Sequence, residues 1–288
     1  MIRSMTGFGA ADGPLGAGRV AVEIRSVNHR FFNPSIKLPS DLSAWEGDVR
    51  ETVRRSVVRG HVTVSARHDR TDSLQIDEGR FGAYVDQLRA LQKRFGLADT
   101  VDVGTVLRLP NVLATSDSDT DGSVAELIAV VNAALTALDA MRSAEGKRLA
   151  DYLLERLSTI AAAVERIAER APARVVEQRD RLRAAVTELS GGILADEQRV
   201  AQEIALLADR LDVGEELSRF RSHLTAFRET LAHPPADGVG KRLGFLIQEL
   251  LREANTTGSK GNDAAIVADV LVIKEELERI REQVENLE

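Results

Sequence analysis

Residues 149–167 read LADYLLERLSTIAAAVERI, and this stretch decides the fold of the second half of the chain. Its apolar side chains recur every three or four residues, at Leu149, Leu153, Leu157, Ile160, Val164 and Ile167. That spacing is typical of one face of an α-helix. Long helices seldom stand alone in water, so this apolar seam predicts packing against other helices or other subunits.

Helical composition extends from this stretch in both directions, from Val124 almost to the C-terminus. Pro172 is expected to begin a new helix, because proline is tolerated in a first turn. Gly191-Gly192 is expected to mark a turn.

Three helices are expected to close the chain. The first runs roughly from Asp196 to Ala232 and the second from Lys241 to Ala254. A loop over residues 255–261 should lead to the third, with Asn262 or Asp263 as its N-cap.

The first 122 residues combine strand and helix patterns. Val20, Val22 and Ile24 alternate with polar or small residues, and His61–Arg67 repeats this period of two, which predicts two half-buried strands. Apolar spacing predicts a helix over residues 43–58 with Ser43 as N-cap, and a second helix over residues 78–95 that Gly96 ends. Residues 109–123 are expected to form a surface loop.

These patterns predict an α+β fold, with a mixed α/β N-terminal domain followed by a long-helix, all-α region. We expect a basic domain for RNA contact and assembly over residues 1–122, and a long helical hairpin or linker over residues 123–195. A C-terminal helical domain over residues 196–288 would carry the candidate metal site.

Composition excludes several classes of protein. The 288 residues contain no cysteine, which excludes disulfides, thiolate zinc sites and cysteine nucleophiles. No signal peptide or membrane-spanning stretch is recognised, so a cytoplasmic location without a membrane is expected. The formal net charge is −7, but residues 1–70 carry 11 basic and 7 acidic side chains, a net charge of +4. The basic N-terminal part could therefore bind a polyanion, although charge alone favours ordinary variation of the protein surface.

Acidic residues and one histidine line up on two of the C-terminal helices. At roughly 100° per residue, Asp212, Glu216, Arg219 and His223 fall within roughly 60° of one another. Glu215 lies just beside this stripe, and the helical angle favours Glu216 as a ligand only modestly. On the next helix Glu249 and Glu253 are i, i+4 neighbours.

Both polar stripes border an apolar face, so packing of the two helices would bring the stripes together. Carboxylates with one imidazole suit Mg²⁺ or Mn²⁺, and the histidine favours Mn²⁺. The alternative is an ordinary solvated helix surface, because such charge patterns are common.

Two further sets of residues suggest phosphate binding. Ser259 and Lys260 precede the last helix, where charge and helix dipole favour an anion, although a glycine-containing turn with an ordinary cap explains them somewhat better when they are taken alone. Asn28 and Arg30 follow a strand, and Arg54, Arg55 and Arg59 crowd the next helix and turn, as in a surface that tracks a phosphate backbone. Aromatic residues make up about 4% of the chain, which argues against base stacking.

Several segments together resemble the YicC-like family of bacterial endoribonucleases along nearly the whole chain. They are residues 1–9, 25–30, 38–39, 59–60, 211–217 with Arg219 and His223, 240–249, 252–256, 259–260 and 281–286. The resemblance implies metal-dependent cleavage of single-stranded RNA inside the channel of a homohexamer. Ala265 and Gly244 depart from the pattern, since the family often has acidic residues there.

The resemblance favours the catalytic interpretation of the acidic stripes. Asp212, Glu216, His223, Glu249 and Glu253 would hold Mn²⁺ or Mg²⁺, and Arg219 and Arg252 would stabilise charge on the scissile phosphate. Asn255, Ser259, Lys260 and the N-terminal arginines would hold single-stranded or structured RNA. The nucleophile, water or the RNA 2′-hydroxyl, stays open at this point.

Two other functions remain as alternatives to cleavage. One is a non-catalytic RNA-binding adaptor or remodeller that presents RNA to other nucleases. The other is a helical scaffold without any role in RNA binding, which the apolar seam alone would explain.

Overall fold

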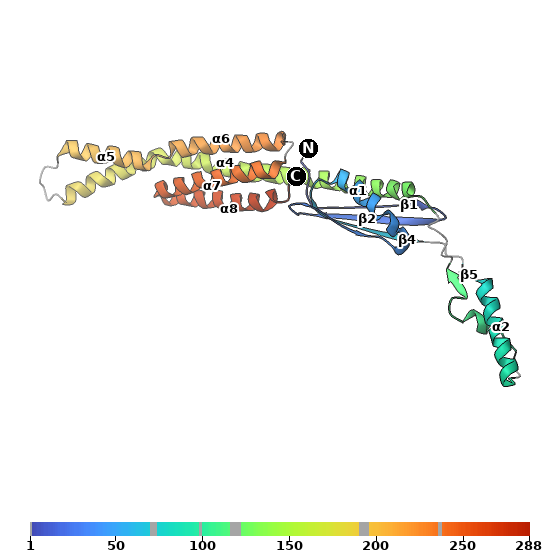
Figure 1. The fold of residues 1–288 in the computed structure, drawn as a ribbon. Coiled ribbons are helices and arrows are strands. Elements are labelled where there is room, and N and C mark those ends of the chain that lie inside the picture. Colours follow the sequence, from blue (N-terminus) through green and yellow to red (C-terminus); the bar gives the residue numbers. More distant parts are fainter. Residues whose placement is uncertain (1, 70–73, 98–99, 116–121, 190–195, 236–237) are drawn as a thin grey trace. The chain divides into compact units, whose positions relative to one another are not determined.

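The computed structural model describes residues 2–69, 74–97, 100–115, 122–189, 196–235 and 238–288 (Figure 1). The chain forms two compact units that are each discontinuous in sequence. The helical unit contains Met1–Gly7, Ser26–Asn28 and Asp139–Glu288, and the sheet unit contains Phe8–Arg25 and His29–Leu138. The α+β class is confirmed, and the three consecutive domains expected from sequence stay a prediction.

The sheet unit is built on four strands in the order β1-β2-β4-β3. They are β1 (Gly7–Leu15), β2 (Gly18–Val27), β3 (Phe32–Lys37) and β4 (Gly60–Asp69). The strands β3 and β4 are parallel, with Phe32 opposite Gly60. Both strands predicted from the period of two are confirmed, as β2 and β4.

Alternation along β2 explains how the sheet acquires a core. Val20, Val22 and Ile24 are fully buried, whereas the side chains between them face outward. Helix α1 (Glu46–Ser56) and the first part of helix α4 (Val124–Leu189) pack against this apolar face. The close approach of α4 requires a glycine, because a Cβ at Gly9 would lie 2.2 Å from the carbonyl oxygen of Ala134.

The start of α1 differs from the prediction. A 3₁₀-helix, η1 (Ser40–Trp45), precedes it, and Ser43 donates to the carbonyl of Ser40 instead of capping α1. Serine hydroxyls compete for nearby backbone groups in this way, which favours a tight turn over a cap.

A smaller part of the sheet unit contains β5 (Leu74–Ile76), α2 (Glu78–Phe95), α3 (Val103–Leu107) and β6 (Leu113–Thr115). Helix α2 is confirmed, and it ends at Gly96 with a left-handed φ of 64°. Leu113–Thr115 pairs with β5, so this part of the predicted loop is a strand. Residues 116–121 of that loop lie outside the described residues.

Helix α4 is a single helix of 66 residues, and Pro172 lies inside it. The prediction that Pro172 begins a new helix is therefore wrong. An internal proline costs about 3 kcal/mol through a lost hydrogen bond. Contacts of Arg170 and Arg174 with the C-terminal helices hold the helix on both sides of Pro172.

One segment of α4 is apolar and long enough to cross a membrane, which the sequence interpretation did not expect. This is weak evidence for a membrane, since a helix in the core of a protein passes the same test.

The helical unit contains four more helices (Figure 1). They are α5 (Glu197–Leu211), α6 (Gly214–Ala232), α7 (Val239–Gly261) and α8 (Ala264–Val284). Apolar residues of α6, α7 and α8 share one core with the seam of α4. Leu153, Leu157 and Ile160 of the seam are fully buried. The prediction that this seam packs on other helices is confirmed.

Two of the predicted C-terminal boundaries are wrong. The helix expected over residues 196–232 is interrupted at Asp212 and Val213, and residues 255–261 continue α7 instead of forming a loop. Thr257 and Gly261 are buried there, so these small residues allow helices to pack closely. Asp263 caps α8, as one of the two predicted capping residues. The turn expected at Gly191-Gly192 lies outside the described residues.

Candidate metal centre

Helices α6 and α7 lie side by side in the helical unit, joined through the short segment after His233 (Figure 1). Residues further along α6 contact residues that come earlier in α7. The two helices are therefore antiparallel. Their apolar faces, with Phe220 on α6 and Leu246 and Leu250 on α7, belong to one core. The polar stripes that border these faces therefore meet along one seam.

Three predicted site residues converge on this seam. His223 from α6 and Glu249 and Glu253 from α7 each offer one ligand atom, and these atoms lie within 4.8 Å of one another. We call these residues the acidic triad. Glu253 is buried, with a side chain that is 4% exposed, whereas His223 and Glu249 are half-buried.

The donors of the acidic triad fit a divalent cation. Two carboxylates and one imidazole are ligands of Mn²⁺ and, with more water, of Mg²⁺. A buried carboxylate such as that of Glu253 also needs a neighbouring positive charge, because burial penalises its ionised form.

Arg219 supplies part of that charge in the structure. Its Nη1 lies 3.6 Å from Oε1 of Glu253, and its Nη2 donates to Glu215, one turn away on α6. The guanidinium therefore bridges two carboxylates at the edge of the triad. Glu215 is exposed and is paired with Arg219.

Asp212 and Glu216 do not join the triad. Nζ of Lys260 lies 2.8 Å from Oε1 of Glu216 and donates to the carbonyl of Asp212 at 2.9 Å. The hydrogen bond with Glu216 raises the pKa of Lys260, so the ammonium stays charged. The Asp212 side chain instead accepts from the backbone N–H of Gly214 at the start of α6.

The ion pair between Glu216 and Lys260 is largely enclosed. The Glu216 side chain is 8% exposed, and among the described residues its Oε2 has no hydrogen-bond partner. A lysine thus occupies the end of the seam where the sequence placed two metal ligands. Lys260 lies on α7, rather than in the loop expected from sequence, and pairs with Glu216 there.

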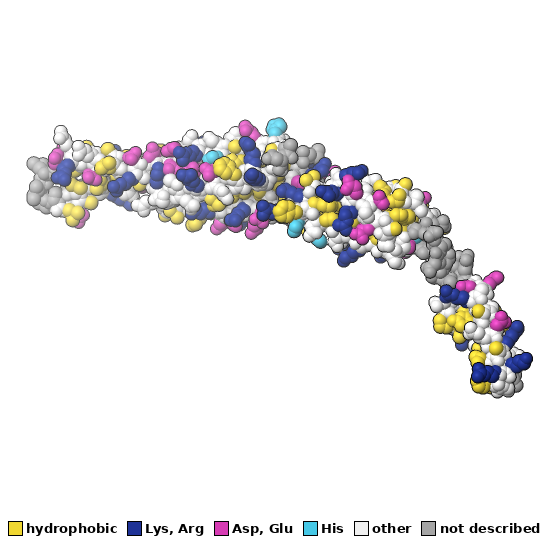
Figure 2. All heavy atoms as spheres, viewed as in Figure 1, with side chains coloured by type: hydrophobic (Ala, Val, Ile, Leu, Met, Phe, Trp, Pro, Cys, Tyr) yellow, Lys and Arg dark blue, Asp and Glu magenta, His cyan; other side chains and the backbone are white. Residues whose placement is uncertain are grey.

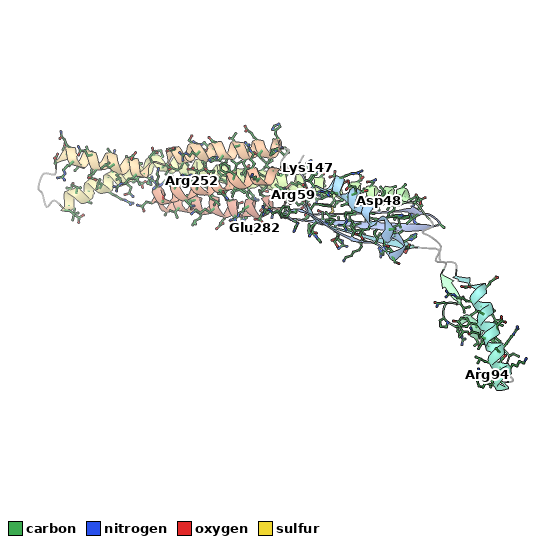
Figure 3. All side chains as sticks on the ribbon, viewed as in Figure 1. Asp48, Arg59, Arg94, Lys147, Arg252 and Glu282 are labelled. Atoms are coloured by element: carbon green, nitrogen blue, oxygen red, sulfur yellow. The ribbon has the colours of Figure 1, made fainter. Side chains whose placement is uncertain are left out.

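Other predicted site residues lie on exposed surface. Arg252 is exposed on α7 (Figure 3), as is Asn255, while Ser259 donates to the carbonyl of Thr256 within the same helix. In the helical unit, Asn28 donates to the carbonyl of Glu285 at 2.7 Å and so has a structural contact.

Of the predicted arginines of the sheet unit, Arg30, Arg54 and Arg55 are exposed and Arg59 is half-buried. Arg54, Arg55 and Arg59 lie on or just after α1, and Arg55 is 3.1 Å from Glu51. Arg30 lies over the ring of Phe31. Figure 3 labels Arg59 and Arg252, which belong to different units.

Arg174 supports the packing at one end of the seam between α6 and α7. The sequence did not identify this residue. Its side chain is fully buried and donates to the carbonyls of Leu211, Lys260 and Gly261, which ties α4 to the ends of α5 and α7. Burial lowers the pKa of this guanidinium. Nothing in the sequence distinguishes Arg174 from the exposed arginines around it.

Comparison with known proteins covers nearly the whole chain. A family model described as "Endoribonuclease YicC-like, N-terminal region" matches residues 2–151, and one described as "Endoribonuclease YicC-like, C-terminal" matches residues 167–288. The chain is 35% identical over 295 residues to a "Probable endoribonuclease YicC" of Clostridioides difficile. It is 33% identical over 292 residues to a protein of the same name from Haemophilus influenzae. Both similarities span 100% of each chain.

Proposed function

The chain belongs to the YicC-like endoribonuclease family, and we propose that it cleaves RNA with the help of a divalent cation held by the acidic triad. The observation that carries this proposal is the convergence of His223, Glu249 and Glu253 within 4.8 Å. The names of the two relatives support RNA as the substrate.

When bound, Mn²⁺ or Mg²⁺ would supply positive charge that polarises a phosphoryl oxygen. Glu249 and Glu253 provide the negative charge that holds this cation, and His223 provides the nitrogen ligand. Arg219 lies beside Glu253 and Arg252 is one turn from Glu249, so both can donate hydrogen bonds to the phosphate. Water is our preferred nucleophile, and a product that ends in a 2′,3′-cyclic phosphate would exclude direct attack by water.

Lys260 has a positioning role in this proposal. It fixes Glu216 and the backbone at Asp212, where α6 begins. Since His223 is on α6, this contact helps to set the register between α6 and α7.

A homo-oligomer that encloses RNA is also part of the proposal, with six copies as the resemblance implies. Helix α2 has 18 residues and none is buried, and hydrophobic side chains lie on the surface over it (Figure 2). Phe95 and Leu97 are 64% and 61% exposed. Large exposed apolar side chains at this density suit contact with another chain. The expected location is the cytoplasm.

The test is incubation of end-labelled single-stranded RNA with the protein and Mn²⁺, beside EDTA and a Glu249→Gln variant. Glu282→Gln, which changes an exposed carboxylate on α8, is the matched control. Cleavage should disappear with EDTA and with Glu249→Gln but persist in the control. Each variant must elute like the wild type from a sizing column.

Other outcomes would contradict part of the proposal. RNA that stays intact but bound in all conditions would favour an adaptor over a nuclease. Cleavage that survives Glu249→Gln would place the reaction away from the acidic triad.

A further inference from the structure

One end of the sheet in the sheet unit gathers residues from three segments of the chain. Strands β3 and β4 are parallel and both begin at this end, where the backbone N–H of Gly60 donates to the carbonyl of Phe31. The end of β2 lies here too, because only residues 28–31 separate it from the start of β3. The start of β1 is beside the end of β2, since the guanidinium carbon of Arg25 is 5.4 Å from the centre of the Phe8 ring.

The face of the sheet that carries Phe8 and Arg25 is opposite the core. Helices α1 and α4 pack on the buried face, and the side chains that alternate with the core residues point the other way. Glu23 and Arg25 on β2 and Arg67 on β4 belong to this outward-facing set.

This outward face carries an excess of positive charge. Arg25 and Arg67 lie 3.5 and 3.7 Å from the carboxylate of Glu23, so two guanidiniums share one carboxylate. Their side chains are 68% and 80% exposed, which leaves N–H groups accessible to a ligand. The outward-facing positions of the four strands include Arg19, Arg25, Lys37 and Arg67 against Asp12, Glu23 and Asp69. That is four positive against three negative charges, on a chain with a net charge of −7.

Two aromatic rings at the same end are exposed and paired with arginines. Phe31 is 64% exposed, with the guanidinium carbon of Arg30 at 5.2 Å from its ring centre, and Phe8 is 39% exposed. A solvated sheet face or a single exposed apolar side chain is ordinary. Here two exposed rings, each beside an arginine, occur at the same end of the sheet, and aromatic rings together with arginines are a combination that binds unpaired nucleic acid. Bases stack on aromatic rings and guanidinium planes, and phosphates bind the positive charge.

We propose that this end of the sheet, built by Phe8, Arg25, Arg30 and Phe31, binds single-stranded RNA by stacking unpaired bases on the two rings. Arg25 and Arg30 contact the phosphates. The inference rests on RNA as the substrate in the proposed function, and it adds where unpaired bases are held. The low aromatic content suggested that stacking would matter little, but these two phenylalanines are gathered at one place.

The test is the affinity of a fluorescent oligouridylate for the full-length protein, measured with EDTA present so that no cleavage occurs. The double variant Phe8→Leu/Phe31→Leu keeps two apolar side chains but removes both rings. It should bind at least about 5-fold more weakly, since stacking on one ring contributes roughly a 5- to 100-fold gain in affinity and the variant removes both rings. The affinity for a blunt RNA duplex should fall less in this variant than the affinity for the oligouridylate, because the bases of a duplex are already stacked on one another.

Charge variants separate this surface from the other side of the sheet unit. Arg25→Glu should weaken RNA binding and make it less dependent on salt. Arg50 is exposed on α1, on the opposite face of the sheet. The Arg50→Glu variant makes the same change of charge and should leave the RNA affinity unchanged. Loss of affinity in Arg50→Glu but not in Arg25→Glu would overturn the proposal and place the RNA on α1.

Two other results would also overturn it. One is unchanged RNA affinity in the phenylalanine variant. The other is loss of affinity together with a change in the number of subunits, which would make this surface a contact between copies. Failure of the wild type to bind any RNA would instead contradict the proposed function itself.

Discussion

Nη1 of Arg219 lies 3.6 Å from Oε1 of Glu253, across the seam between α6 and α7. Glu253 also belongs to the acidic triad, so the guanidinium and a divalent cation would compete for one carboxylate. Replacing Arg219 with Gln should tighten Mn²⁺ binding about two- to five-fold, as expected for a half-exposed ion pair. The same variant should cleave RNA more slowly, because a donor to the phosphate is lost. Calorimetric titration with Mn²⁺ measures the first effect independently of activity.

Arg221→Gln is the matched control for that experiment. Arg221 is on the same helix, but it pairs with Glu165 at 2.8 Å. Its removal should leave Mn²⁺ affinity unchanged. Equal Mn²⁺ affinity in Arg219→Gln and the wild type would refute the competition between guanidinium and cation.

Removal of Lys260 should destabilise the helical unit. Lys260→Met leaves the largely buried carboxylate of Glu216 without its ammonium partner. A lost partner of a buried charge costs up to about 5 kcal/mol, and the partial exposure of Lys260 reduces the expected loss to about 1–3 kcal/mol. Urea unfolding followed by circular dichroism measures it. Adding Glu216→Gln should restore part of the stability, and a double variant no more stable than Lys260→Met would argue against this ion pair.

Acid should weaken the contact between α4 and α8. Arg170 donates to Asp263 at 2.8 Å and holds the pKa of this carboxyl below its ordinary value of 3.8. The folded state therefore binds fewer protons than the unfolded state, so the stabilisation is complete above about pH 4 and is lost as the pH falls through the folded-state pKa.

Asp263→Asn tests this pH dependence, because asparagine still caps α8 but cannot ionise. Urea midpoints measured from pH 7 down to pH 3 should fall less steeply in the variant than in the wild type. Glu282→Gln, at an exposed position, should keep the wild-type slope. A variant curve parallel to that of the wild type would contradict the assignment.

Close packing of α4 on β1 should make Gly9 intolerant of a side chain. A Cβ would lie 2.2 Å from the carbonyl oxygen of Ala134 and 2.5 Å from the backbone nitrogen of Leu138. Because both contacts are with backbone, Gly9→Ala should destabilise the fold by about 2–3 kcal/mol. Gly47→Ala, in helix α1 where a Cβ meets open space, should instead stabilise it by about 0.5 kcal/mol. Urea unfolding measures the stability of both variants. If Gly9→Ala were as stable as Gly47→Ala, the close approach of α4 to β1 at Gly9 would be disproved.

Local patterns predicted the elements whose side chains repeat regularly. The alternation at Val20, Val22 and Ile24 became β2, and the helix predicted over residues 78–95 has those same bounds. Predictions failed where a residue type that usually breaks a helix is held by contacts distant in sequence. Pro172 stays inside α4 between two arginines that contact the C-terminal helices. Gly258 and Gly261 stay inside α7, where a Cβ at either would crowd Val270 or Ile266 of α8.

The sequence by itself determined the α+β class, the apolar seam of α4 and the positions of His223, Glu249 and Glu253 at the border of their helix faces. Helical periodicity fixes the direction in which a side chain leaves its own helix. It does not fix the register between two helices, which the packing of their apolar faces sets. Only the tertiary structure therefore decided that three of the five expected ligands converge and that Lys260 forms an ion pair with Glu216. It also decided that Arg174, one arginine among many in the sequence, is buried and ties the ends of α5 and α7 to α4.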